Sequence, residues 1–293
     1  MITLNPNELK TPELHGLLLA AVAPRPICFA STIDTEGNSN VSPFSFFNIF
    51  SSNPPIAVFS PARSGRTGMT KNTLDNVKEV PEVVINIVTY EMVQQVSLAS
   101  SEFPKGVDEF VKAGFSKEPS KLIKPFRVKE SPVQLECKVK EVIELGTGGG
   151  AGNLVVCEII LLHIDERVMT DGKIDQKKIN LVARLGANWY SKAYGDALFE
   201  LVKPLNTLGI GIDCLPHKIK NSAYLSGNDL GKYGNLNALP SEEEIERMKL
   251  SENVKEILES NQDALTKEIK LVGVAKELLH EDRIKDSLAV LMC

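Results

Sequence analysis

Two long stretches of strand-forming residues, joined by a run of glycines, constrain the possible folds of this chain more than any other feature. In residues 133–145 apolar side chains alternate with charged ones, which is the period of a strand with one buried face. Residues 154–164 are nearly all apolar, so we expect that strand to be buried on both faces. The glycine-rich run 146–152 leads into a strand, not into a Lys-Ser/Thr pair that opens a helix. It therefore predicts a mobile hairpin connection instead of a phosphate loop.

Shorter β-rich runs precede this pair of strands, at residues 26–33, 40–50, 56–59 and 83–88. Two short helices are expected among them, at residues 72–79 and 107–113, and Gly114 suits the end of the second. A doubly wound parallel sheet would need strands that alternate regularly with helices of about ten to fifteen residues. The pattern therefore predicts a mainly β fold with helical inserts (β/α+β), built on a closed or half-closed barrel.

The last third of the chain has a different character. It begins with a glycine-rich, loop-like stretch, after which Ser241 and three glutamates form a typical helix start. Helices are expected over residues 242–261 and 263–281. We therefore predict two domains, with the barrel in residues 1–205 and a loop-rich, helical C-terminal extension in residues 206–293.

Charge and composition exclude several classes of partner. The chain has 293 residues and a formal net charge of −5, so it has no global attraction for nucleic acid. No run approaches the roughly 18 apolar residues that a membrane span needs, and the N-terminus lacks the pattern of a secretory signal. We expect a soluble, cytoplasmic protein with no nucleic-acid partner and no membrane partner.

The five cysteines and four histidines are too widely spaced for a metal site of the usual pattern. Reduced, buried thiols are typical of a cytosolic protein. If the hairpin of residues 146–152 is centred near Thr147, Cys137 would face Cys157. We expect these two to be neighbouring thiols and not a disulfide.

Residues 40–48 are the first segment with features of a binding site. Asn40-Val41-Ser42-Pro43-Phe44-Ser45-Phe46-Phe47-Asn48 combines aromatic side chains with small hydroxyls and amides directly after a strand. The aromatic residues offer a flat apolar wall, and the hydroxyls and amides supply neutral donors and acceptors. This combination suits a planar heteroaromatic ring with polar edges. The alternative is an ordinary strand and loop with a core aromatic cluster.

Residues 60–73 are the second such segment. They contain three cations, several hydroxyls and two glycines, and they lead directly into the helix expected at Asn72. Helix N-termini expose unpaired N–H groups, and Arg and Lys add charge-assisted hydrogen bonds, so this is the best anion site in the sequence. The alternative is a solvated basic loop that precedes a capped helix. Together the two segments suggest a ligand with a ring and a phosphate, which is the shape of a mononucleotide.

Between Ala23 and Asn86 the order and spacing of many residues match a known pattern. The matching residues are Pro24–Ile27, Ala30–Asp34, Gly37, Asn40–Asn48, Pro54-Pro55, Ser60, Lys71–Leu74, Asn76 and Val84–Asn86. In these features the chain resembles the flavin reductase-like family, whose fold is an FMN-binding split β-barrel. The resemblance continues more weakly through Arg184-Leu185-Gly186 and Trp189-Tyr190, and nothing is recognised beyond Leu205.

The resemblance implies roles for individual residues. The isoalloxazine ring and ribityl chain would be lined by Thr32, Asn40, Val41, Ser42 and Ser45. The phosphate would be held by Ser60, Arg63, Thr67, Lys71, Asn72 and Thr73. The family usually has Asp where Asn72 stands, and an amide avoids placing a carboxylate beside a phosphate dianion. Arg63 and Arg66 are alternatives for one cation role.

Three residues near the end of the resemblance are expected to act across a dimer interface. By resemblance, Arg184, Trp189 and Tyr190 would approach the flavin of the second protomer. The alternative for Trp189 is a core or interface anchor. Asn86 lies in an apolar strand and is expected either to contact the ligand or to form buried structural hydrogen bonds.

The function implied is that of an FMN-binding oxidoreductase, an NAD(P)H-dependent flavin reductase that works as a homodimer. The flavin supplies the chemistry, and neither paired carboxylates nor an activated nucleophile lies near the two segments. The chain lacks a GxGxxG fingerprint after a strand, so NAD(P)H would bind only transiently. Electrons would pass to a small-molecule acceptor or a redox partner protein. The alternatives are a flavin-binding electron carrier reduced by a protein partner, and a non-redox split-barrel binding protein.

Overall fold

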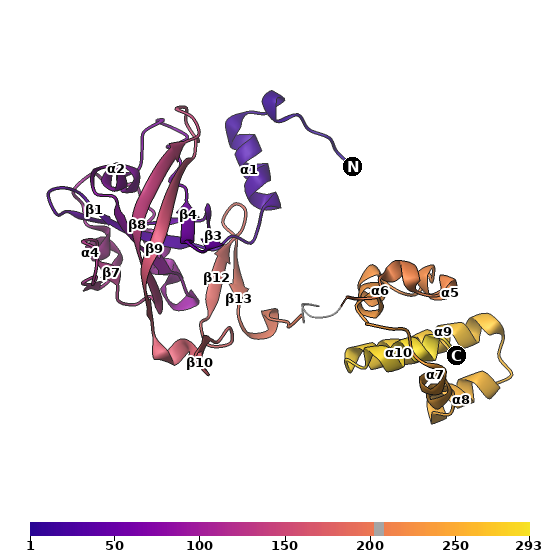
Figure 1. Ribbon diagram of the computed structural model, residues 1–293. Coiled ribbons are helices and arrows are strands. Elements are labelled where there is room, and N and C mark those ends of the chain that lie inside the picture. Colours follow the sequence, from indigo (N-terminus) through magenta and orange to yellow (C-terminus); the bar gives the residue numbers. More distant parts are fainter. Residues whose placement is uncertain (202–207) are drawn as a thin grey trace. The chain divides into compact units, whose positions relative to one another are not determined.

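The computed structural model describes residues 1–201 and 208–293, which divide into two compact units, Met1–Phe199 and Glu200–Cys293 (Figure 1). Each unit has hydrophobic clusters of its own. The expected domain boundary after residue 205 falls at residues 202–207, outside the described residues. No helix among the described residues combines the length and the apolar character needed to cross a membrane.

The first unit is built on one large antiparallel sheet of seven strands. In sheet order these are β2 (Ser39–Phe44), β1 (Cys28–Ile33), β5 (Glu82–Ile87), β8 (Val133–Glu144), β9 (Asn153–Ile164), β4 (Pro55–Phe59) and β3 (Phe47–Ser52). Three two-stranded ribbons accompany it: β6 (Lys117–Glu118) with β7 (Arg127–Val128), β10 (Met169–Thr170) with β11 (Lys173–Ile174), and β12 (Leu181–Arg184) with β13 (Tyr190–Ala193).

The connection between the two edge strands shows that this sheet is curled. β2 and β3 lie at opposite edges, yet only Ser45 and Phe46 separate them in the chain. Two intervening residues allow at most about 11 Å between the flanking Cα atoms. A flat sheet of seven strands would hold its edges about 29 Å apart. The sheet must therefore roll up until β2 and β3 meet, and no pairing joins them among the described strands, so the barrel is split along this seam.

The inside of the curled sheet holds the main hydrophobic core, with Phe44, Phe59, Ile85 and Leu135 among its members. Four α-helices belong to this unit: α1 (Thr11–Ala21), α2 (Asn72–Glu79), α3 (Val93–Leu98) and α4 (Glu109–Ala113). A second core forms on the outer side of β1, where Phe29 packs with residues of α3 and α4. The expected helical inserts in a mainly β unit are thus present, and α2 begins and ends at the residues predicted for it.

Several expectations about the strands need correction. The run 40–50 is not one strand, because the chain turns at Ser45 and Phe46 and continues on the far edge of the sheet. β9 is not buried on both faces, since Leu162 is exposed. In the first half of the strand every second residue is buried, and in the second half none is. Cys137 pairs with Ile159 and not with Cys157, because the β8–β9 turn is centred between Gly148 and Gly149, with Glu144 opposite Asn153, and not near Thr147. Both cysteines are buried free thiols.

The second unit is helical. Its helices are α5 (His217–Lys220), α6 (Gly227–Gly234), α7 (Glu242–Lys249), α8 (Glu252–Glu259), α9 (Ala264–His280) and α10 (Ile284–Leu291). The single helix expected over residues 242–261 is two helices, because Ser251 has extended backbone angles and begins a new one. The glycine-rich stretch is less loop-like than expected, since Ser226 and Asp229 form a capping box that starts α6.

Candidate functional site

The segments 40–48 and 60–73 line one hollow on the first unit. A cavity of about 340 Å³ is lined by Asn40, Ser42, Ser64, Thr67, Met69, Thr70, Lys71, Asn72, Thr73, Ser100, Ser101, Glu102, Phe103, Pro104, Lys105 and Glu109. A second cavity of about 200 Å³ is lined by Ser42, Pro43, Phe44, Ser45, Phe46, Ser60, Ala62, Lys71 and Ser100. The two share Ser42, Lys71 and Ser100, so they adjoin. The larger cavity alone has a volume in the usual range for a small-molecule site, and the smaller one extends it.

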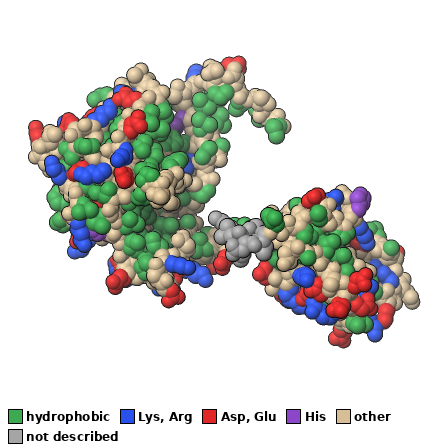
Figure 2. All heavy atoms as spheres, in the orientation of Figure 1, with side chains coloured by type: hydrophobic (Ala, Val, Ile, Leu, Met, Phe, Trp, Pro, Cys, Tyr) green, Lys and Arg blue, Asp and Glu red, His purple; other side chains and the backbone are tan. Residues whose placement is uncertain are grey.

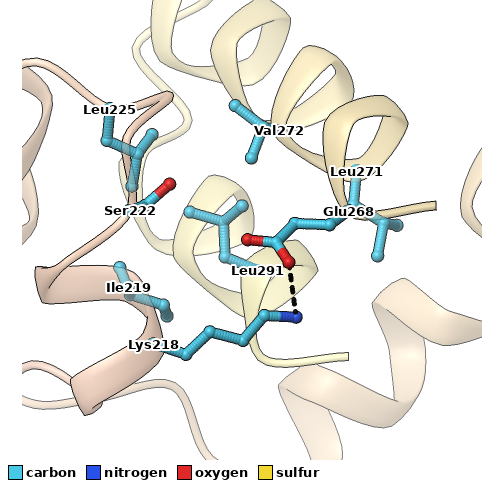
Figure 3. A pocket seen from close by; sticks show the side chains of 8 residues that line it. All are labelled: Lys218, Ile219, Ser222, Leu225, Glu268, Leu271, Val272 and Leu291. Atoms are coloured by element: carbon cyan, nitrogen blue, oxygen red, sulfur yellow. Dashed lines mark ion pairs between the residues drawn. The ribbon is translucent and has the colours of Figure 1, made fainter. Parts of the chain in front are cut away.

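A pocket in the second unit is much smaller. It lies among α5, α9 and α10, where Lys218 and Glu268 form an ion pair at 3.4 Å beside apolar side chains such as Leu271 (Figure 3). Its volume of about 30 Å³ has room for roughly one water molecule. The joined cavities of the first unit are therefore the better candidate for a ligand site.

Neighbouring strands fix the start of the 60–73 segment. The Ser60 N–H donates to the carbonyl of Phe46 at 2.8 Å, and the Ser60 hydroxyl accepts from the Asn153 N–H at 3.0 Å. The segment then crosses the cavity wall and enters α2 at Asn72, with Lys71 as the residue before the first turn. The unpaired N–H groups at the start of α2 therefore lie beside Lys71 and Thr73, which both line the larger cavity.

A buried amide joins three elements under the larger cavity. The Asn40 carbonyl oxygen accepts from the Thr73 hydroxyl at 2.8 Å, and the Asn40 amide donates to Glu109 Oε1 at 3.0 Å. The second oxygen of Glu109 accepts from the Val41 N–H at 3.3 Å. These bonds tie β2 to α2 and to α4, so the wall of the cavity is held by partners that are far apart in the sequence.

Thr32 and Val41 support this wall from behind. Their side chains are fully buried, and neither residue lines a cavity. The Thr32 hydroxyl instead donates to the side-chain oxygen of Asn40, Oδ1, at 3.4 Å and accepts from the Asn76 side-chain amide at 3.1 Å. Asn86 is likewise internal, since its amide donates to the Phe29 carbonyl.

Glu109 was not found from the sequence. Burial raises the pKa of its carboxyl, and this effect exceeds the lowering by the hydrogen bonds from Val41 and Asn40. An acidic residue after Asp108 is typical of the first turn of a helix, so the sequence offered an ordinary explanation for it.

The opposite wall, Ser100–Lys105, was also not found from the sequence. These residues follow α3 and line the larger cavity. The Ser100 hydroxyl donates to the Ser97 carbonyl at 2.6 Å, which ties this segment to the end of α3. Glu102 in this wall pairs with Lys71 at 3.0 Å and with Arg66 at 2.9 Å. A short polar loop carries no local signal that it faces a segment some thirty residues earlier.

The two arginines of the 60–73 segment lie in different places. Arg63 pairs with Glu144 at 3.3 Å and donates to the Gly68 carbonyl at 3.4 Å, and it does not line either cavity. Arg66 is exposed and reaches Glu102 at the cavity wall. The cation that lines both cavities is Lys71.

The glycine-rich connection 146–152 is fastened to the 60–73 segment. The Arg63 N–H donates to the Ala151 carbonyl at 2.9 Å, and the Gly150 N–H donates to the Arg63 carbonyl at 3.1 Å. A Cβ atom on Gly149 would lie 3.1 Å from the carbonyl oxygens of Ser64 and Gly65. The glycines thus allow two backbones to approach closely, which the expectation of a mobile connection did not include.

Arg184, Trp189 and Tyr190 lie together on one hairpin of the first unit. All three belong to the β12–β13 hairpin, where the Arg184 guanidinium stacks 4.6 Å from the Tyr190 ring centre and donates to the Trp189 carbonyl. The Trp189 side chain is 72% exposed. These residues line neither of the two joined cavities.

Comparison with known proteins agrees with this architecture. Residues 20–178 match the model of the flavin reductase like domain. The chain belongs to the flavin reductase-like family. An uncharacterized protein of Halalkalibacterium halodurans is 35% identical over 203 residues, which are 69% of this chain and 96% of that relative. An uncharacterized protein of Aquifex aeolicus is 33% identical over 195 residues, which are 66% of this chain and 97% of that relative.

Solved structures show the same fold. Component B of nitrilotriacetate monooxygenase from Bacillus cereus is 28% identical, with a TM-score of 0.63 over 69% of this chain and 98% of that chain. A flavin reductase with a split barrel domain from Shewanella frigidimarina is 27% identical, with a TM-score of 0.58 over 67% of this chain and 95% of that chain. The curled sheet is therefore a split barrel, as the sequence predicted, and a helical C-terminal extension follows it.

Proposed function

We propose that the first unit binds FMN in its joined cavities and reduces it with NAD(P)H. The observation that carries this proposal is that segments 40–48 and 60–73 line adjoining hollows that share Ser42 and Lys71. One hollow offers an apolar, aromatic wall, and the other offers a cation and the start of a helix. Membership of the flavin reductase-like family supports a flavin-related oxidoreductase.

The residues present fit the two ends of this cofactor. Lys71, the hydroxyls of Ser64, Thr67 and Thr70, and the free N–H groups at the start of α2 would hold the phosphate. Pro43 and Phe46 would flank the ring, with Ser42 and Ser45 as neutral hydrogen-bonding partners. The buried Asn40–Glu109 bond keeps the wall between the two ends rigid.

When bound, the flavin supplies the hydride chemistry. The work of this chain is to hold the ring in one orientation and to leave one side open for a nicotinamide. Proximity and orientation account for hydride transfer, so no side chain needs to act as a general acid or base. NAD(P)H binds transiently in this proposal, and the electrons pass to a small-molecule acceptor or to a protein partner.

We also propose that the protein works as a homodimer. Ile49 and Phe50 of the edge strand β3 are exposed, as is Phe46 directly before it. Trp189 is exposed on the β12–β13 hairpin. Apolar side chains also gather along α1 (Figure 2), where Leu17 and Leu18 are exposed. Exposed apolar side chains on a sheet edge are typical of an interface. Light scattering tests this proposal, and a monomer with full FMN occupancy would reject it.

The free thiols of the described chain suit the reducing cytoplasm, which is where we place the protein. The decisive experiment is the absorption spectrum of the purified protein, supplied with FMN, before and after NADH or NADPH. We expect a yellow protein that either nucleotide bleaches. A yellow protein that resists both but is reduced by a redox protein would support an electron carrier instead. A protein that takes up no FMN would reject the proposal.

One variant tests the phosphate end of the site. Lys71→Ala removes the cation that lines both cavities, and we expect it to weaken FMN binding about tenfold or more, the effect of one charge-assisted contact. Lys78→Ala is the matched control, because Lys78 lies at the other end of α2 and pairs with Glu144 outside the cavities. Equal FMN affinity of the two variants in a fluorescence titration would refute the assignment of Lys71.

A further inference from the structure

The acidic residue in the wall of the phosphate end is not explained by the function proposed above. Glu102 presents one carboxylate oxygen to Lys71 at 3.0 Å and the other to Arg66 at 2.9 Å. Both cations come from the 60–73 segment, and Glu102 comes from the facing segment that follows α3. A single carboxylate thus engages Lys71, the cation that lines both cavities, and Arg66 of the same segment.

The charges around the larger cavity cancel because of this residue. Its lining contains two cations, Lys71 and Lys105, and two carboxylates, Glu102 and Glu109. Glu109 is buried and bonded to Asn40 and the Val41 N–H, so it is held in the wall. The Glu102 side chain is about half exposed. In the described hydrogen bonds and ion pairs, its carboxylate contacts only Lys71 and Arg66. It is therefore the acid that can move.

We propose that Glu102 is a built-in competitor of the phosphate and sets how tightly the site holds a phosphorylated flavin. A phosphate monoester carries nearly two negative charges at neutral pH. To reach Lys71, it must displace the Glu102 carboxylate or share the cation with it at close range, and both are unfavourable. A flavin whose ribityl chain ends in a hydroxyl leaves the two ion pairs intact.

The consequence is a site that holds FMN loosely and accepts unphosphorylated flavin nearly as well. FMN would then exchange between turnovers, so a reduced flavin can leave as a product. This inference rests on the proposed function, since it concerns flavin in the same cavity. It adds that the flavin is an exchanging substrate and names Glu102 as the residue that determines specificity.

The test compares FMN with riboflavin in the wild-type protein and in Glu102→Gln. The amide keeps the shape of the side chain and removes its charge. We expect Glu102→Gln to bind FMN about tenfold more tightly at low ionic strength, with riboflavin affinity unchanged. The gain should shrink as salt is added, because the charges are exposed to solvent. Flavin fluorescence measures all four affinities without any turnover.

Glu144→Gln is the matched control. Glu144 also bridges two cations, Arg63 of the 60–73 segment and Lys78 of α2, but it lines neither cavity. Glu144→Gln changes the net charge of the protein by the same amount as Glu102→Gln. The comparison therefore separates the effect of the Glu102 carboxylate at the cavity from the effect of net charge. We expect FMN to bind to Glu144→Gln as it binds to the wild type. An equal gain in both variants would overturn the proposal.

Other results also reject the role of Glu102. If Glu102→Gln binds FMN no more tightly than the wild type, or if riboflavin affinity rises equally, the carboxylate does not compete with the phosphate. Inorganic phosphate, titrated by calorimetry, probes the same cations without a flavin. Stronger phosphate binding to Glu102→Gln supports the role of Glu102 even if neither protein binds flavin, and that combination would reject the proposed function alone.

Discussion

At the scale of single residues, Asn40 shows how the wall of the cavity depends on distant partners. Its amide is bonded on one side to Thr73 and on the other to Glu109, which follows it by 69 residues. Residue types near Asn40 predicted a polar, aromatic segment and left open whether it binds a ligand or belongs to an ordinary strand and loop. They could not reveal Glu109, because the identity of a buried partner depends on tertiary packing and not on local spacing. The resemblance to the family placed Thr32 at the ligand, whereas its side chain lies behind Asn40 and is bonded to it.

The carboxyl of Glu109 leads to a prediction about pH. Burial raises its pKa above the ordinary value of 4.5, so the folded protein binds this proton more tightly than the unfolded chain does. Its contribution to stability is therefore fully present below pH 4.5 and is lost as the pH rises through the folded-state pKa. Glu109→Gln cannot titrate. We expect the free energy of unfolding of the wild type, relative to Glu109→Gln, to fall as the pH is raised from 4.5.

Urea unfolding of both proteins at a series of pH values measures this difference. Taking the difference between the two proteins removes the effect of every other titrating group, including Glu136, whose pKa is shifted in the opposite direction. Burial alone would raise the pKa of Glu136. Hydrogen bonds from the Lys121 and Leu122 N–H groups and from His163 have the larger effect, so the pKa lies below its ordinary value. Parallel stability curves for wild type and Glu109→Gln would show that Glu109 does not titrate differently on folding.

At the scale of elements, local sequence patterns predicted individual helices such as α2, but they did not predict which strands pair with one another. α2 was predicted at its observed bounds from Leu74 and Val77, which lie on one side of a helix, and the structure buries both. The curling of the sheet depends on β4 pairing with β9, about a hundred residues later, and no local pattern specifies that register. α1 was not predicted, since none of its residues is buried and its apolar residues do not gather on one face.

The glycine-rich connection between β8 and β9 gives a prediction at this scale. Gly149→Ala would place a methyl group 3.1 Å from the Ser64 and Gly65 carbonyl oxygens, so the 60–73 segment must shift. Because Ser64 and Thr67 line the cavity, we expect FMN affinity to fall severalfold, which is the effect of an ill-placed hydrogen-bonding group. A fluorescence titration with FMN measures this change.

The neighbouring glycine provides the control for this experiment. A Cβ atom on Gly148 would have no heavy atom within 4 Å, and neither glycine has a positive φ. Gly148→Ala should therefore bind FMN like the wild type, although it changes the same connection by the same methyl group. If the two variants behaved alike, the contact between this connection and the 60–73 segment would have no role in the site.

At the scale of the whole molecule, the two units differ in what their sequence revealed. The resemblance to a known family covered the first unit and supplied its barrel topology. For the second unit, helix starts such as Ser241 with Glu244 were visible, but the packing of the helices was not, because it depends on apolar contacts between segments far apart. The relative from Halalkalibacterium halodurans matches this chain over 203 residues and 96% of its own length, so it has little room for a counterpart of the second unit.

This comparison leads to a prediction about a shortened chain that ends at Phe199. Every residue that lines the joined cavities belongs to the first unit, and that unit has its own hydrophobic core. The shortened chain should therefore fold and bind FMN with the affinity of the full chain. Circular dichroism checks the fold, and a fluorescence titration checks the binding. If the shortened chain is folded but binds FMN at least tenfold more weakly, the second unit contributes to the site, and the cavity of the first unit alone does not account for binding.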